Sequence, residues 1–121
     1  MNVSGLFVYL TEASSYRGLA FLIRDMPMAP YRFASTDRLD IAYLEWNPQG
    51  TRTAILLHGW PDSPECWKAI APRLVEAGYR VLAPALRGFA PTRVRDPSTP
   101  RSGQLSALGR DLLQFIEVLG L

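Results

Sequence analysis

The chain has 121 residues, of which 48% are apolar and 20% are charged, and its formal net charge at pH 7 is +2. These values are ordinary for one folded domain and argue against a disordered chain. The charge is small and the arginines are scattered, so no nucleic-acid partner is expected. The densest group of arginines falls in a proline-rich stretch that we interpret as a solvated loop, and it comprises Arg87, Arg93, Arg95 and Arg101.

Cysteine usage and apolar runs narrow the class of protein further. Cys66 is the single cysteine, which excludes an internal disulfide and gives no basis for a metal site. The longest apolar runs, residues 19–23 and 54–57, are far shorter than the roughly 18 residues that cross a membrane. The start of the chain lacks the pattern of a secretory signal. We therefore expect a cytoplasmic location, no membrane partner, no metal and no cofactor.

Residues 1–30 differ from the rest of the chain and are interpreted as a loosely attached extension. Short apolar stretches alternate there with polar ones, and two prolines stop any helix before the first clear strand signal. Met26 and Met28 lie just before that signal. We expect the natural start at one of them rather than at Met1.

The first regular element is predicted to be an antiparallel hairpin. Residues 31–35 form its first strand and residues 36–38 its turn, while Leu39, Ile41 and Tyr43 share one face of the second strand. The polar run at 47–50 then ends the hairpin.

Two further strands read as buried in a parallel sheet. Residues 53–57 are apolar without alternation, as expected where helices cover both faces of a strand, and residues 80–85 repeat the pattern. A proline-punctuated loop is predicted over 87–103. Strands that alternate with helices after a hairpin predict an α/β fold.

A helix is predicted to begin at Asp62–Glu65, where a capping side chain precedes Pro64. Pro72 interrupts it, so we expect a kink or two short pieces, and Gly78 is placed as a left-handed end. Its buried stripe consists of Trp67, Ile70, Ala71, Leu74, Val75 and Gly78.

The last helix is predicted to begin near Ser102 and to end at Gly120. Its apolar face consists of Leu105, Leu108, Leu112, Ile116 and Leu119. The residues expected to face water are Arg110, Asp111, Gln114 and Glu117.

The turn His58-Gly59-Trp60-Pro61 carries the clearest chemical signal. It follows a buried strand directly, and ligands of open α/β sheets collect at the carboxyl ends of strands. Gly59 permits close approach of the backbone. The Trp60 N–H could then donate to an oxygen that becomes negative in a transition state, an effect worth about 3 kcal/mol per donor.

At these residues the sequence resembles the α/β-hydrolase family, in which a His-Gly-x-Pro turn after the third strand supplies one of two oxyanion-hole amides. The resemblance covers about residues 31–121. It looks most like the epoxide-hydrolase branch, whose members often read His-Gly-Trp-Pro-Asp and use an aspartate nucleophile. The motifs that carry it are His58 to Asp62, Trp67, Ala77 to Val81, Pro84, Leu86 to Phe89 and the helix from Leu108 to Leu121.

The sequence departs from the family pattern in three ways. Ala85 stands where many members have aspartate, and residues 88–92 replace a Gly-x-Gly-x-Ser turn. The family places its nucleophile on an elbow after the fifth strand, with acid and base later still, and none of these lies in the chain. His58, the single histidine, is assigned by the resemblance to packing and hydrogen bonding. We therefore expect no catalytic residue here, and we assign Trp60, Gly59, Pro61 and His58 to an oxyanion and substrate-binding turn.

Other reactive side chains have structural interpretations. Ser63 precedes a proline at a helix start and is read as a cap, and Asp62 and Glu65 as acids that favour the helix dipole. Trp67 is assigned to the core.

Three functions remain open. The chain is read as a fragment of an epoxide-hydrolase-like enzyme that ends before strand five and is inactive alone, as a fragment of a serine esterase or lipase, or as a non-catalytic module completed by a second chain. Without strand five, residues 53–57 become an open apolar edge, so self-association through this strand is expected.

Overall fold

The computed structural model describes residues 29–121, so the proposed start sites and nearly all of the expected extension lie outside the described residues. No helix in the described part is long and apolar enough to cross a membrane. The elements in chain order are β1 (Arg32–Ser35), β2 (Leu39–Trp46), β3 (Arg52–Ile55), the 3-10 helix η1 (Pro64–Ala69), α2 (Ala71–Glu76), β4 (Tyr79–Pro84), β5 (Arg93–Val94) and α3 (Leu105–Val118).

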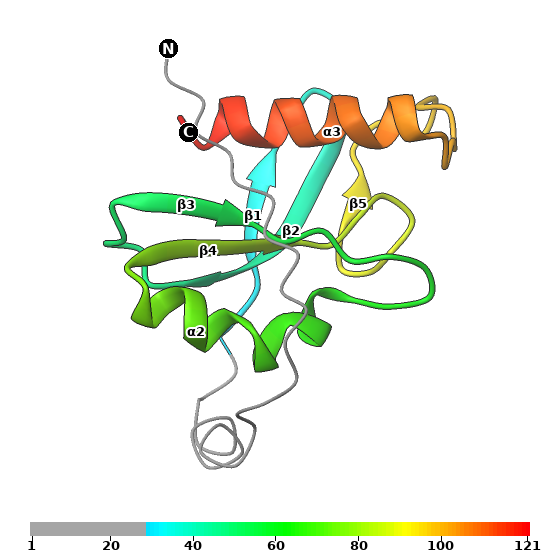
Figure 1. Cartoon of the computed structure of the whole chain (residues 1–121). Helices are drawn as coiled ribbons and strands as arrows, with labels where there is room; N and C mark the ends of the chain where they lie inside the picture. Colours follow the sequence, from blue (N-terminus) through cyan, green and yellow to red (C-terminus); the bar gives the residue numbers. More distant parts are fainter. Residues whose placement is uncertain (1–28) are drawn as a thin grey trace.

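The strands form one mixed sheet in the order β1-β2-β4-β3, with β5 paired to β2 (Figure 1). β1 and β4 both run antiparallel to β2, whereas β3 runs parallel to β4. The predicted hairpin and α/β class are thereby confirmed. Within residues 29–121, β3 is an edge strand, which explains why its side chains are half-buried rather than covered on both faces.

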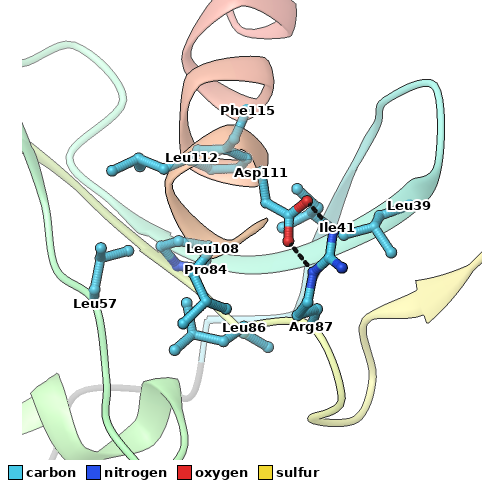
Figure 2. Close-up of a pocket in the computed structure, with 11 residues that line it drawn as sticks. Leu39, Ile41, Leu57, Pro84, Leu86, Arg87, Leu108, Asp111, Leu112 and Phe115 are labelled. Atoms are coloured by element: carbon cyan, nitrogen blue, oxygen red, sulfur yellow. Dashed lines mark hydrogen bonds and ion pairs between the residues drawn. The ribbon is translucent and has the colours of Figure 1, made fainter. Parts of the chain in front are cut away.

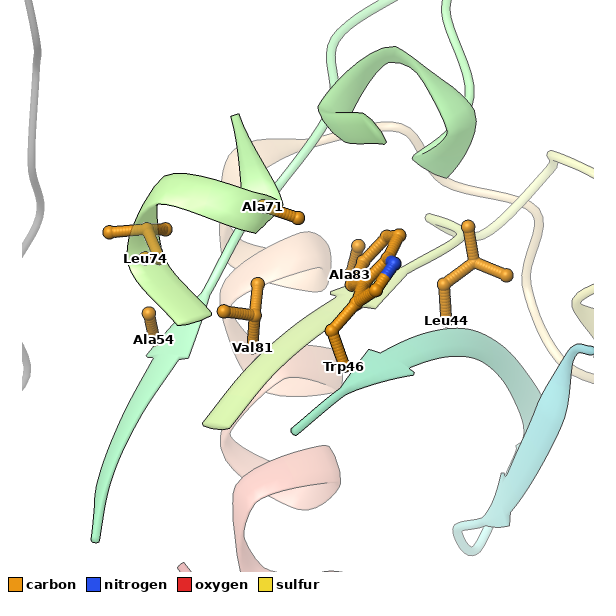
Figure 3. Packing of buried hydrophobic residues seen from close by; sticks show 7 residues of the cluster. All are labelled: Leu44, Trp46, Ala54, Ala71, Leu74, Val81 and Ala83. Atoms are coloured by element: carbon orange, nitrogen blue, oxygen red, sulfur yellow. The ribbon is translucent and has the colours of Figure 1, made fainter. Parts of the chain in front are cut away.

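Helices cover the two faces of the sheet, and β2 contributes to both cores. On the α2 side, Leu44 and Trp46 pack with Val81, Ala71 and Leu74 (Figure 3). On the α3 side, the predicted face of Leu39, Ile41 and Tyr43 packs around Phe115, whose ring meets that of Tyr43 edge-on at 5.2 Å. β2 is therefore a central strand, and it ends at Trp46, just before the polar run that was expected to end it.

The expected helix after Asp62 is divided into two pieces, as Pro72 predicts. η1 has 3-10 geometry, and Pro72 lies in the first turn of α2, where its missing N–H costs little. The tighter turn of η1 shifts the side chains around the axis. This is why Ile70, expected in the buried stripe, is exposed while Ala71 and Leu74 are buried. Gly78 adopts the expected left-handed conformation, with φ of +84°.

The orientation of α3 agrees only in part with the expected one. Its most buried residues are Asp111 and Phe115, whereas Leu105 is 85% exposed and lies at the first position of the helix. The assignment of Asp111 to the water-facing side was therefore wrong. Asp111 is buried because its carboxylate pairs with Arg87. The remaining residues of the expected apolar face are half-buried, and these are Leu108, Leu112, Ile116 and Leu119.

The stretch expected to be a loop over 87–103 contains the short strand β5, which the sequence analysis missed. Arg93 and Arg95 lie near Asp40 rather than being solely solvated, and the Arg87 side chain is only 11% exposed. The interpretation of this arginine group as a solvated loop therefore fails for Arg87.

Candidate active site

The His58–Pro61 turn lies at the carboxyl end of β3, beside the segment that leaves β4. Because β3 and β4 are parallel, their carboxyl ends meet at one edge of the sheet. The Leu56 N–H donates to the Leu82 carbonyl, after which β3 separates from the ladder and turns. The sheet thus presents the turn where α/β proteins bind ligands.

The imidazole of His58 connects the two segments. His58 is buried, with only 4% of its surface exposed. Its Nε2 accepts a hydrogen bond of 3.0 Å from the Leu86 N–H, and its Nδ1 lies 3.0 Å from the Gly59 carbonyl oxygen. The Phe89 ring stands edge-on to the imidazole at 4.8 Å. Both nitrogens are occupied by the backbone, which favours a structural role for His58 over that of a base.

The Gly59–Trp60 peptide has a fixed direction. The Gly59 carbonyl accepts from His58 and also, at 2.8 Å, from the Asp62 N–H. Since this peptide is planar and trans, the Trp60 N–H points to the opposite side. Within residues 29–121 this N–H has no hydrogen-bond acceptor, and the Trp60 residue is 85% exposed. The turn therefore offers one free, oriented amide donor.

A buried ion pair between Arg87 and Asp111 lies next to Leu86, the backbone partner of His58. The Arg87 Nε and Nη2 donate to the two carboxylate oxygens of Asp111, each at 2.6 Å (Figure 2). Hydrogen bonding to Asp111 raises the pKa of Arg87. The adjoining cavity, which Leu57 and Leu112 also line, has a volume of about 20 Å³. That is room for about one water molecule, so this cavity is not a substrate pocket.

The other reactive side chains near the turn have local hydrogen-bond partners. Ser63 occupies the N-cap position of η1, but its side chain makes no capping bond, and its N–H donates instead to Asp62 Oδ1. Glu65 accepts a hydrogen bond of 2.7 Å from the Tyr31 hydroxyl. Burial acts to raise the pKa of Glu65, but hydrogen bonds from Tyr31 and Ser63 lower it overall.

Trp67 packs against the core on the α2 side, as expected for a core residue. This core, the Trp46 cluster, consists of Leu44, Trp46, Ala54, Ala71, Leu74, Val81 and Ala83. The buried Nε1 of Trp67 has no hydrogen-bond partner in the described part of the chain. Among residues 29–121 no group of three or more His, Cys, Asp or Glu side chains is arranged to hold a metal ion.

Sequence reasoning missed the residues that support the turn from outside it. These are the hydroxyl of Thr92, which holds the Ala85 carbonyl, and the Phe89 ring, which packs on His58; both come from the loop after β4. The motif Leu86 to Phe89 pointed to this loop, but spacing alone gave no signal for its partners.

Residues 54–120 match the model of the alpha/beta hydrolase family. The chain belongs to this family. The epoxide hydrolase srdG of Neurospora crassa is 36% identical over 69 residues, which cover 57% of this chain and 20% of that protein. A pimeloyl-[acyl-carrier protein] methyl ester esterase of Aromatoleum aromaticum is 48% identical over 44 residues, or 36% of this chain and 17% of the esterase.

The similarity extends to solved structures. A protein of Klebsiella pneumoniae described as a candidate epoxide hydrolase superposes with a TM-score of 0.71 at 38% identity, over 74% of this chain and 30% of that one. The chain thus spans less than a third of the length of each of these three relatives.

Proposed function

We propose that this chain forms the oxyanion-donor part of an epoxide-hydrolase-like enzyme. In an epoxide-hydrolase-like enzyme an aspartate nucleophile, which this chain does not supply, would open the epoxide and form an ester. The Trp60 N–H would then donate to the ester's carbonyl oxygen, which becomes negative when water attacks the carbonyl carbon. Gly59 and Pro61 shape the turn that a substrate approaches, and His58 holds it. The observation that carries the proposal is the free Trp60 N–H at the carboxyl edge of a parallel strand pair.

The proposal assigns no nucleophile, acid or base to this chain. The single histidine has both ring nitrogens bonded to the backbone, so it has no lone pair left to accept a proton from water. We infer that the 121-residue chain does not turn over substrate by itself. Pure chain should hydrolyse styrene oxide and p-nitrophenyl acetate no faster than buffer, and turnover abolished by Trp60→Pro would contradict this.

A chimera tests the oxyanion role. Residues 54–120 would replace the matching segment of the Neurospora crassa relative, and the hydrolysis of styrene oxide would be measured. Trp60→Phe retains the N–H and should leave kcat within a few-fold. Trp60→Pro removes the N–H and should lower kcat by about 10²–10³-fold. Thermal unfolding of both variants separates lost chemistry from lost folding, and equal activity of the two folded variants would refute the role.

The same exchange into the Aromatoleum aromaticum esterase tests the second candidate, a serine esterase or lipase, which the 48% identity over 44 residues favours. Turnover of a methyl ester in that chimera, with no epoxide hydrolysis in the first, would move the assignment to the esterases.

A non-catalytic module completed by a second chain is favoured by a different observation, the open edge of β3 within the described residues. Failure of both chimeras, together with a compact monomer of the isolated chain in solution, would support the module.

A further inference from the structure

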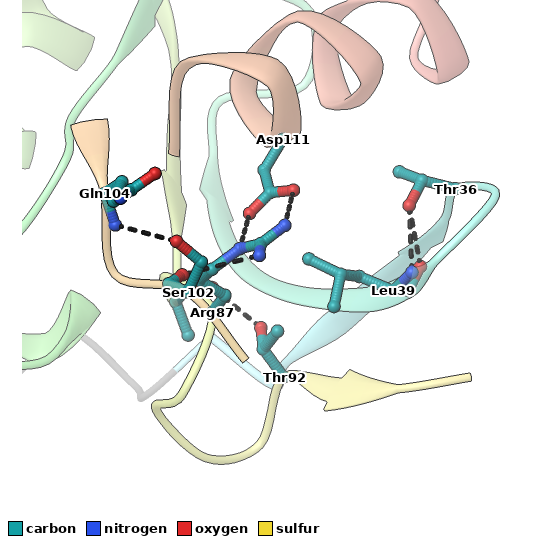
Figure 4. Close-up of polar contacts among 8 residues, drawn as sticks. Thr36, Leu39, Arg87, Thr92, Ser102, Gln104 and Asp111 are labelled. Carbon is teal, nitrogen blue, oxygen red and sulfur yellow. Dashed lines mark hydrogen bonds and ion pairs between the residues drawn. The ribbon is translucent and has the colours of Figure 1, made fainter. Parts of the chain in front are cut away.

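Thr92 ties the loop after β4 to the central strand. Its hydroxyl oxygen accepts a hydrogen bond of 2.9 Å from the Ala42 N–H of β2. The hydroxyl donates at 2.7 Å to the Ala85 carbonyl, and Figure 4 shows how the Thr92 side chain points toward the segment that carries Arg87. The hydroxyl is therefore used in both directions, and its orientation is determined by the two backbone groups.

The Ala85–Leu86 peptide continues this connection. Its carbonyl is held by Thr92, and the N–H of the same planar trans unit, that of Leu86, donates to His58 Nε2 at 3.0 Å. An imidazole that accepts at Nε2 carries its proton on Nδ1, and that nitrogen lies 3.0 Å from the Gly59 carbonyl. The Gly59 carbonyl in turn shares its peptide unit with the Trp60 N–H.

We propose that Thr92 is a positioning residue for the Trp60 amide, which it orients through the Ala85–Leu86 peptide and the His58 ring. Four hydrogen bonds join β2 to the Gly59–Trp60 peptide, and every donor faces in the same sense, from Ala42 toward Trp60. Hydrogen bonds arranged head to tail polarise one another, so the last N–H becomes a stronger donor to an anionic oxygen.

The catalytic part of this inference rests on the proposed oxyanion role of Trp60, but the arrangement of the chain of hydrogen bonds can be tested without activity. His58 is the only histidine, so the 15N spectrum of the histidine-labelled chain contains one imidazole. We expect a pyrrole-type Nδ1 and a pyridine-type Nε2. A proton on Nε2 in the neutral ring would overturn the proposal without any variant.

Two substitutions test the part played by Thr92. Thr92→Ser retains the hydroxyl and should preserve the imidazole spectrum of the unaltered chain. Thr92→Val retains the shape and removes both hydrogen bonds, so we expect the two ring-nitrogen shifts to converge, as in exchanging tautomers, and the Trp60 amide signal to move. Unchanged amide signals from the Trp46 cluster show that Thr92→Val still folds. An unchanged imidazole spectrum in folded Thr92→Val would refute the proposal.

The chimera then distinguishes the two proposals. Thr92→Val should lower kcat by about tenfold or more with little change in KM, and Thr92→Ser should restore it. If His58 has the expected tautomer but Trp60→Pro retains full activity, the oxyanion role fails while the hydrogen-bonded arrangement stands. If Trp60→Pro is inactive and Thr92→Val is fully active, the positioning role of Thr92 fails alone.

Discussion

Asp111 shows how a single polar contact can bury a residue that periodicity assigns to the water-facing side of a helix. Its carboxylate accepts two short hydrogen bonds from Arg87, and both side chains are only 11% exposed. A paired buried charge contributes little net stability, but removal of one partner leaves the other buried without compensation.

We therefore predict that Asp111→Ala lowers the free energy of unfolding by about 3–5 kcal/mol, measured by urea titration. Asp37→Ala is the matched control. Asp37 is 48% exposed and makes two long ionic contacts, of 3.4 Å with Arg110 and 3.8 Å with Arg38, so its loss should cost less than about 1 kcal/mol. Equal effects of the two substitutions would mean that the Arg87 pair does not hold α3.

The pKa of the Cys66 thiol gives a prediction for its rate of alkylation. Burial, followed by the neighbouring Asp62 carboxylate, raises the pKa of the thiol to about 11. Alkylation by iodoacetamide requires the thiolate, so the rate should rise about tenfold per pH unit from pH 7 to 9 without a plateau. Asp62→Asn should increase the rate at each pH. A plateau above pH 8.5, as for an ordinary thiol, would contradict the raised pKa.

Among the elements, the turn between β2 and β3 depends on a glycine. The Gly50 N–H donates to the Asn47 carbonyl at 3.0 Å, and a Cβ built on Gly50 would lie 2.1 Å from the Arg80 backbone nitrogen. A side chain there would push β4 away from the turn.

Gly50→Ala should therefore destabilise the chain by about 2 kcal/mol or more, because the obstructing atoms are backbone. Gly109→Ala should have the opposite effect on the free energy of unfolding. Gly109 lies inside α3 with open space around it, so alanine should raise that free energy by about 0.5–1 kcal/mol. Both changes in the free energy of unfolding can be measured by the same denaturant titration. A neutral Gly50→Ala would show that β4 does not pass so close to the turn.

The elements also show what periodicity can and cannot predict. The hairpin, the division at Pro72 and the left-handed Gly78 depend on local stereochemistry, which the sequence contains directly. The burial of Asp111 in α3 depends on Arg87, 24 positions away, and only the fold brings the two together. The same limit applies at the site: the motif placed His58 at a strand end, whereas the support from Thr92 depends on contacts with β2 that spacing does not encode.

At the scale of the whole molecule, the unpaired outer edge of β3 is a surface prone to self-association. Because the Leu56 N–H donates to β4, the alternate residues Thr53, Ile55 and Leu57 direct their N–H and carbonyl groups away from β4, where no strand pairs with them in the described part. We propose that the isolated chain self-associates through this edge.

Light scattering at tens of micromolar should detect particles larger than a monomer. Thr53→Pro removes an outward donor without removing a bond to β4, and it should shift the population toward monomer. Ala54→Pro, one residue further, removes a bond to β4 instead and should destabilise the fold. A compact, cooperative monomer of the unaltered chain would contradict self-association.

Replacement of one backbone atom tests the oxyanion role of Trp60 most directly. In the chimera with the Neurospora crassa relative, an ester in place of the Gly59–Trp60 amide exchanges the N–H for an oxygen and leaves both side chains unchanged. We predict that kcat for styrene oxide falls by about 10²–10³-fold while folding is retained. An unchanged kcat would show that the Trp60 amide does not stabilise the reacting oxygen.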